Sequence, residues 1–277
     1  MAGKIKRWFL KLPISVWYLL GILMLAILAP WVTPYPEDAA NAMHFEARLL
    51  PPSSSHPFGT DALGRDVLTL VVFGSRLSLI TAIGVVGLAL CIGVPLGLLA
   101  GYLGGRSGSI IMRICDIFLA FPPLLLPIMF TAALGPSLRN AVIAVALSWF
   151  PWYTRILRAQ VLTVRSQPFI SAARISGNGH GQIMLRHILP NTIQPVLVQA
   201  TLDMGYAILA VAGLSFIGFG AQPPAIEWGL LITSARATFL DYWWTAFFPG
   251  LALFITVLAF NRAGDWMRRK MNVPESL

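Results

Sequence analysis

Long apolar stretches separated by short polar segments dominate this chain. An apolar stretch of about 20 residues is long enough to cross the hydrocarbon core of a bilayer as a helix. Six such stretches can be recognised, at residues 14–32, 77–99, 110–134, 141–157, 192–219 and 245–260. Lipid offers the backbone no hydrogen-bond partner, so each stretch must form its hydrogen bonds internally. The pattern predicts an all-α, polytopic membrane protein with six transmembrane helices.

A polar segment at 167–191 separates the fourth and fifth apolar stretches. It carries two arginines and two histidines, and the sequence Gly177-Asn178-Gly179 at its centre disfavours a continuous helix. Apolar residues on both sides of this centre recur at helical spacing. The segment is therefore predicted to form two short helices joined by a hinge, which together offer a surface to a partner. The alternative is an amphipathic surface loop that binds nothing.

The composition and the placement of charge indicate a membrane protein and argue against nucleic acid as a partner. Hydrophobic residues make up 57% of the chain and charged residues 11%, far from the soluble average. The net charge is +9, but with a cytoplasmic N-terminus 15 of the 20 Lys and Arg residues fall on cytoplasmic segments. Basic residues accumulate on that side of membranes, so both termini and segment 167–191 are expected to be cytoplasmic. Membrane lipid is the expected partner of the apolar surface.

Acidic residues lie mainly on the outer side, at Glu37, Asp38, Glu46, Asp61, Asp66, Glu227 and Asp241. An acidic outer side is compatible with a cationic or protein partner, and solvated loops explain it equally well. Cys91 and Cys115 lie in apolar stretches and are expected to be buried small hydrophobic residues, not a disulfide or a metal pair. All four histidines fall in loops, so no metal site is predicted.

The chain divides into an N-terminal anchor helix with an outer loop, at 1–58, and a core domain at 59–277. A basic segment at 4–11 precedes the first stretch, as in a signal peptide. That stretch is about 19 residues long and lacks a small-x-small cleavage site, so it is expected to be retained. Residues 33–58 are rich in Pro and Ser, show no periodicity and are predicted to be loop.

Two sequence features bear on how the core helices pack. Gly93, Gly97 and Gly101 recur at every fourth position, which favours close helix packing, although glycine is also simply common in membrane helices. Pro122, Pro123 and Pro127 predict a break or distortion in the third helix. Such a break either lines a cavity or serves packing alone.

The stretch Gly59-Thr60-Asp61-Ala62-Leu63-Gly64-Arg65-Asp66 precedes the second apolar stretch. Thr60 or Asp61 can cap a helix, and Asp61 and Arg65 are spaced to form an i,i+4 ion pair. Every motif position of this stretch matches the GTDxxGRD signature that opens the core of dipeptide, oligopeptide and nickel ABC permeases. The chain thus resembles that permease family at this point.

A second resemblance lies in segment 167–191. Ala172-Ala173, Gly177 and His187-Ile188-Leu189-Pro190-Asn191 are similar to the cytoplasmic EAA loop of ABC importer permeases, the coupling helix that docks on the ATPase subunit. Ser171 stands where that family usually has glutamate, so the carboxylate that could pair with the ATPase is missing. Further similar runs bring the resemblance to about residues 59 to 266, at 214–220, 228–229, 248–252 and 259–265.

The resemblance implies a type I ABC importer transmembrane domain in the bacterial inner membrane. It implies a heterodimer with a second permease, two cytoplasmic ATPase subunits that bind ATP and Mg²⁺, and an external substrate-binding protein. No cofactor is expected in this chain. The implied cargo is a di- or oligopeptide, and the alternatives are nickel and a metal-opine chelate.

Asp203 is the one acidic residue deep inside an apolar stretch. It lies 12 residues beyond Asn191, which places it about 18 Å along a helix and near the middle of the bilayer. A carboxylate there is costly and usually faces the protein interior or a wet path. It is predicted to line a translocation path, and the alternative is a structural hydrogen bond to a neighbouring helix. It also resembles an aspartate at the same place in nickel-type permease subunits.

Other functional classes lack their motifs in this sequence. No GxxxxGK[ST] is present, so ATP chemistry must come from another subunit. A serine intramembrane hydrolase would need GxSxG, but around Ser215 the second glycine comes one residue late. An aspartyl hydrolase would need two facing aspartates, and a channel would carry a selectivity ring that is not recognisable. The chain is therefore predicted not to be an enzyme.

Overall fold

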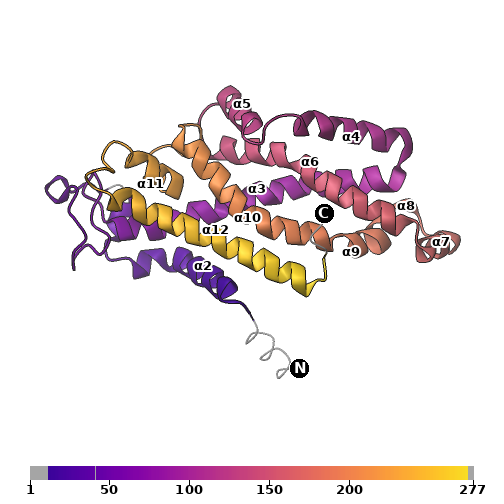
Figure 1. Cartoon of the computed structure of the whole chain (residues 1–277), viewed down its shortest axis with the longest axis horizontal. Helices are drawn as coiled ribbons and strands as arrows, with labels where there is room; N and C mark the ends of the chain where they lie inside the picture. Colours follow the sequence, from indigo (N-terminus) through magenta and orange to yellow (C-terminus); the bar gives the residue numbers. More distant parts are fainter. Residues whose placement is uncertain (1–11, 41, 274–277) are drawn as a thin grey trace, which may run out of the picture.

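The computed structural model describes residues 12–40 and 42–273, and these residues form helices joined by loops, with no β-strand beyond one isolated bridge. The elements are α2 (Ile14–Val32), η1 (Pro36–Ala40), η2 (Phe45–Ala47), α3 (Val67–Leu103), α4 (Gly105–Leu119), α5 (Leu125–Leu134), α6 (Leu138–Arg165), α7 (Pro168–Ile175), α8 (His180–Gln182), η3 (Ile183–Ile188), α9 (Leu189–Thr192), α10 (Gln194–Phe216), α11 (Trp228–Ser234) and α12 (Trp244–Lys270). Figure 1 shows the long helices running roughly along one direction, with α7 and α8 at one end and α11 at the other. The predicted all-α architecture is confirmed.

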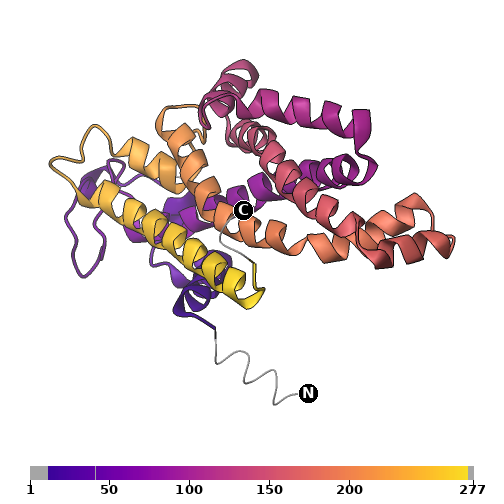
Figure 2. The same cartoon turned by 45° about the vertical axis from the view of Figure 1, so that its right-hand side comes forward.

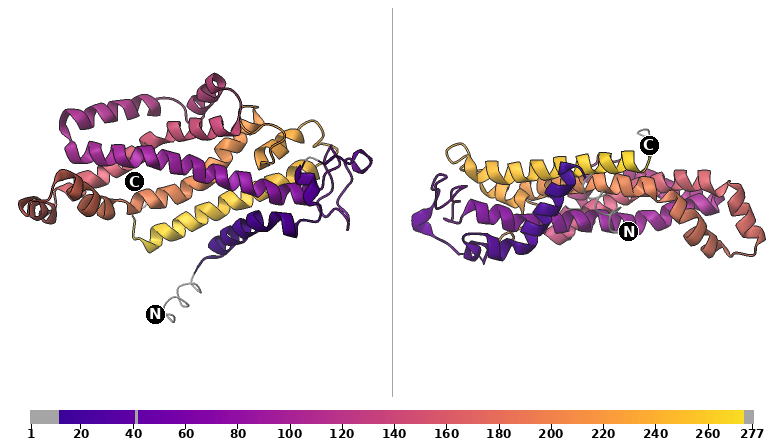
Figure 3. Two further views of the ribbon diagram at one scale, coloured as in Figure 1. Left: turned by 180° about the vertical axis from the view of Figure 1, so that it is seen from behind. Right: turned by 90° about the horizontal axis from the view of Figure 1, so that it is seen from below.

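The centre of the fold is the contact between α3 and α6, which lie side by side over much of their length (Figures 1 and 3). Gly93, Gly97 and Gly101 of α3 face α6 so closely that a side chain has no room. A Cβ atom on Gly97 would lie 2.7 Å from the Thr154 carbonyl oxygen, and one on Gly101 would lie 2.6 Å from the Val161 Cβ. The predicted small-residue strip is thus confirmed as a helix-packing surface.

Around this centre, α10 packs between α6 and α12, and α2 lies on the outside against α3 and α12 (Figure 2). The Tyr18 hydroxyl of α2 lies 3.0 Å from the Thr256 Oγ1 of α12. Most of α2 is uncovered, and Ile14 and Trp31 are 80% and 77% exposed. Such an apolar outer surface is what lipid covers in a membrane-spanning helix.

The predicted count of six transmembrane helices is not confirmed. By length and composition, four helices among the described residues can cross a membrane: α2, α3, α10 and α12. The predicted third helix at 110–134 is two shorter helices, α4 and α5, separated by a turn that contains Pro122 and Pro123. Proline has no backbone N–H to donate, so the predicted break is confirmed. The fourth predicted helix corresponds to α6, which has 28 residues but contains four arginines that lower its mean hydropathy.

The signature 59–66 forms a turn instead of a capped helix, which corrects the prediction that Thr60 or Asp61 is an N-cap. Thr60 and Asp66 form the isolated bridge, and Arg65 Nη2 contacts Asp61 Oδ2 at 2.7 Å, so the predicted ion pair is confirmed. The N-cap is Asp66, whose carboxylate accepts from the Thr69 N–H at 2.8 Å. Helix α3 therefore begins at Val67, ten residues before the predicted start, and has 37 residues.

The two cysteines differ in their surroundings. Cys115 of α4 is buried, as predicted, whereas Cys91 of α3 is exposed, so the prediction for Cys91 was wrong. Cys91 lies two residues from Gly93, which faces α6. Two residues turn a helix by about 200°, so Cys91 lies on the side of α3 that faces away from α6.

Candidate coupling hairpin and translocation site

Segment 167–191 forms a helical hairpin, which we call the coupling hairpin, at one end of the molecule (Figure 1). Helix α7 leads out and α8, η3 and α9 lead back. Gly177 at the tip has φ +82°, a conformation that side-chain-bearing residues rarely adopt. The Asn178 backbone N–H and Nδ2 both donate to the Ala173 carbonyl, at 3.2 and 2.9 Å. The predicted two helical arms and hinge are confirmed, and the returning arm contains a π-helical segment, η3.

The coupling hairpin exposes most of the residues that resemble the EAA loop. Ser171, Ala172, Gly177, Pro190 and Asn191 are exposed. His187 is half-buried, and Ala173 is buried. Ile170 of the outgoing arm and Ile183 and Ile188 of the returning arm are buried as well, as part of the hydrophobic core.

Large apolar side chains of the coupling hairpin remain uncovered. Ile175 is 88% exposed, Leu185 62% and Phe169 44%. The hairpin lies at one end of the long helices (Figure 1). Exposed apolar residues gathered in one small element are typical of a protein contact surface.

The coupling hairpin is connected to the body of the protein through the end of α3. The Tyr102 hydroxyl lies 2.7 Å from the His180 Nδ1. Arg165, just before the hairpin, donates from Nη1 to the carbonyl oxygens of Gly101 and Tyr102, at 2.9 and 3.1 Å. These bonds cap the otherwise unpaired carbonyls at the end of α3. A displacement of the hairpin would therefore pull on α3.

Asp203 lies in α10 and is 9% exposed. Its carboxylate accepts hydrogen bonds from the Tyr153 hydroxyl of α6 at 2.7 Å and from Gln199 Nε2 at 2.9 Å. The bond to Tyr153 is the structural contact between helices that the sequence left open as an alternative. Tyr153 itself was missed, because nothing in the sequence links two residues 50 positions apart.

Asp203 also borders a cavity, and its role in lining a translocation path stays a prediction. The cavity has a volume of about 470 Å³ and lies between α6, α10 and the break between α4 and α5. Aromatic and proline side chains form most of its wall: Phe118, Phe121, Pro122, Pro123, Trp149, Trp152 and Tyr206. The predicted break in the third helix therefore lines a cavity.

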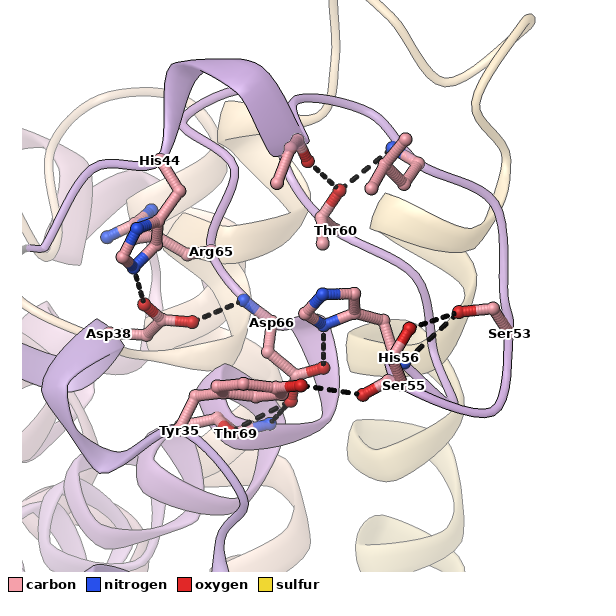
Figure 4. A network of polar contacts seen from close by, with 12 residues as sticks. Tyr35, Asp38, His44, Ser53, Ser55, His56, Thr60, Arg65, Asp66 and Thr69 are labelled. Carbon is pink, nitrogen blue, oxygen red and sulfur yellow. Dashed lines mark hydrogen bonds and ion pairs between the residues drawn. The ribbon is translucent and has the colours of Figure 1, made fainter.

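Three of the seven outer acidic residues, Asp38, Asp66 and Glu227, are buried and hydrogen-bonded, and Figure 4 shows the first two. Asp38, 1% exposed, accepts from the Asp66 backbone N–H at 2.6 Å and contacts His44 Nε2 at 3.0 Å. Asp66, fully buried, contacts His56 Nδ1 at 3.1 Å. Glu227, 1% exposed, caps α11. Asp38, Asp66 and Glu227 therefore fix the outer loops, whereas Glu37, Glu46 and Asp241 are exposed, as expected of solvated loops. A cationic or protein partner at this side stays a prediction.

The outer end is also closed by tryptophans whose role sequence reasoning missed. Trp228 Nε1 donates to the Val71 carbonyl at 2.9 Å, and Trp244 Nε1 donates to the Thr60 carbonyl at 3.1 Å. The first bond joins α11 to α3 across 157 residues of sequence, and the second joins α12 to the turn 59–66 across 184 residues. In the described part of the chain, no group of three or more His, Cys, Asp or Glu residues could hold a metal ion.

Apolar spanning helices, a polar hairpin at one end and a cavity beside a buried carboxylate together define a polytopic membrane protein of the transporter class. A family model described as the binding-protein-dependent transport system inner membrane component matches residues 93–273. The chain belongs to this family. It is accordingly a multi-pass inner-membrane permease subunit of an ABC importer, without enzymatic activity of its own, and works with ATPase subunits and a substrate-binding protein.

Relatives of known type are similar over most of their length. The chain is 45% identical over 247 residues to a probable D,D-dipeptide transport system permease protein of Escherichia coli (strain K12), covering 89% of this chain and 82% of the relative. It is 40% identical over 266 residues to the nickel transport system permease protein of the same organism, covering 95% and 93%. It is 40% identical over 263 residues to a glutathione transport system permease protein of Pectobacterium atrosepticum, covering 95% and 87%.

The fold also matches solved transporter structures. An inward-facing structure of the MetNI methionine ABC transporter aligns with a TM-score of 0.59 at 20% identity, covering 73% of this chain and 96% of that one. At this identity the likeness concerns the fold, and it supports the predicted importer transmembrane architecture.

Proposed function

We propose that this chain forms half of the translocation path of an importer for di- or oligopeptides. The similarity to peptide permeases supports this cargo. Nickel, or a metal-opine chelate, is the second candidate, favoured by the similarity to a nickel permease. The bare ion is the weaker choice, because among the described residues Asp203 is the only His, Cys, Asp or Glu around the cavity, and one carboxylate cannot replace a metal's ligand set.

The observation that carries the proposal is the coupling hairpin. It projects beyond the spanning helices, exposes apolar side chains and is hydrogen-bonded to α3 through Tyr102 and His180. In the proposed mechanism, closure of two cytoplasmic ATPase subunits on bound ATP and Mg²⁺ moves the hairpin. The helices then expose the cavity alternately to the two sides of the membrane.

The assembly that this mechanism requires is a heterodimer with a second permease, served by an external binding protein. Both termini and the coupling hairpin lie in the cytoplasm in this proposal, because the positive charge of the sequence concentrates there. The turn 59–66 and α11 then lie on the outer side, where the binding protein delivers its ligand.

The test is the effect of Ile175→Asp on the reconstituted complex. A charge in place of the most exposed apolar side chain of the hairpin should abolish its contact with the ATPase. Binding-protein-stimulated ATP hydrolysis and uptake of labelled dialanine are then both expected to fall at least tenfold. Ser54→Asp, at an exposed position in the outer loop, is the matched control and should retain both activities. Full stimulation and uptake with Ile175→Asp would mean that the hairpin is not the coupling element.

A further inference from the structure

Asp203 is a buried carboxylate whose hydrogen-bond partners are both neutral. Tyr153 and Gln199 each donate one hydrogen bond to it, and no ion pair found in residues 12–40 and 42–273 includes it. A carboxylate has about four acceptor positions, so roughly two remain free. Burying a charge without a cation is costly, which makes the open positions a site for a positive group.

The wall of the adjoining cavity has the chemistry that accompanies cation binding. Five aromatic rings line it, from Phe118, Phe121, Trp149, Trp152 and Tyr206. The face of an aromatic ring attracts an ammonium group, and tryptophan does so most strongly. Trp152 and Tyr206 are 43% and 61% exposed, so the cavity is open on their side. Two of the rings therefore lie at its open side, where an ammonium group can contact them.

We propose that this cavity is a transient binding site for the N-terminal ammonium group of the transported peptide. The ammonium pairs with Asp203, and the rings surround it and the first side chain. A volume of about 470 Å³ suits a ligand fragment of this size. This inference rests on the proposed function, since it assumes that peptides pass through this subunit.

The experiment places a cysteine in the cavity wall and measures its reaction with charged reagents. Ser148 lines the cavity, and Ser148→Cys is nearly isosteric. It is made in the assembled complex, with Cys91→Ser and Cys115→Ala removing the native thiols of this chain. The reagents are methanethiosulfonates that carry either a trimethylammonium or a sulfonate group. The rate of the trimethylammonium reagent is divided by the rate of the sulfonate reagent. This ratio is measured in the protein with Asp203 and in the variant Asp203→Asn.

The carboxylate of Asp203 concentrates cations beside the thiol. The rate of the cationic reagent divided by the rate of the anionic reagent is therefore expected to be at least about tenfold higher with Asp203 than with Asp203→Asn. Dialanine should slow the cationic reagent, whereas N-acetyl-dialanine, which has no ammonium group, should not. This protection measurement needs no change at Asp203, so it stands even if Asp203→Asn fails to assemble. Equal ratios in both proteins, or equal protection by both peptides, would overturn the proposal.

Uptake of dialanine by the same preparations separates this inference from the proposed function. Uptake together with equal reagent ratios means that the chain carries peptides without an ammonium site. A cation preference without dialanine uptake means that the site exists but that the peptide cargo is wrong, which also overturns the assignment of the site to a peptide ammonium.

Discussion

Replacing Gly97 by alanine tests the contact between α3 and α6 on which the fold depends. The added Cβ would lie 2.7 Å from the Thr154 carbonyl oxygen and 3.0 Å from the Leu157 Cβ, where ordinary contacts begin near 3.4 Å. The carbonyl is part of a helix backbone, so the two helices must separate. Overpacking of this kind costs about 1–3 kcal/mol.

The matched control is Gly87→Ala, in the same helix. A Cβ on Gly87 meets nothing within 4 Å. Both variants gain the same helix propensity of about 1 kcal/mol, so the difference between them isolates the packing cost. The assay is unfolding of the purified chain in mixed micelles with increasing SDS, followed by circular dichroism. Gly97→Ala should be less stable than Gly87→Ala by about 1–3 kcal/mol. Equal stability of the two variants would refute the close approach of α3 and α6.

Three further predictions concern buried carboxylates. Asp203→Asn keeps an acceptor for the Tyr153 hydroxyl, so the yield of assembled complex should be retained. Uptake should fall, because the charge is lost. Full uptake would exclude a role for the charge. Asp203→Leu leaves that hydroxyl without a partner at a cost of about 1–3 kcal/mol, so the yield of assembled complex should fall below that of Asp203→Asn. Asp66→Ala removes the N-cap of α3 and should destabilise the chain by about 0.5–2 kcal/mol in the same SDS titration, whereas an unchanged midpoint would contradict the capping role.

Much of the helical architecture could be predicted because it depends on local signals. Apolar stretches predict spanning helices, the paired prolines predict the break between α4 and α5, and Gly177 predicts the hinge of the coupling hairpin. The start of α3 was misplaced, because Thr60 or Asp61 was expected to be the cap, whereas the structure has Asp66 as the N-cap. The count of six spanning helices is not confirmed, because arginines in α6 and the break after α4 leave segments that length and composition alone do not assign to lipid.

The candidate site was predictable only in part. Asp203 was evident as a lone carboxylate in an apolar stretch, but its partner Tyr153 and the aromatic cavity arise from contacts between helices far apart in the sequence. The burial of the outer carboxylates Asp38, Asp66 and Glu227 was missed for the same reason. Asp38 bonds to the backbone of Asp66, 28 residues later, and a sequence pattern cannot distinguish such a buried carboxylate from a solvated one.

The central claim, that this chain imports peptides at the expense of ATP, is tested most directly in proteoliposomes. They would contain this chain, the second permease and the two ATPases, with binding protein outside and ATP inside. The account predicts that labelled dialanine accumulates inside above its external concentration, and that omission of ATP or of the binding protein abolishes this accumulation. Entry of dialanine that stops at equal concentrations and needs no ATP would contradict the account, because it is the behaviour of a channel.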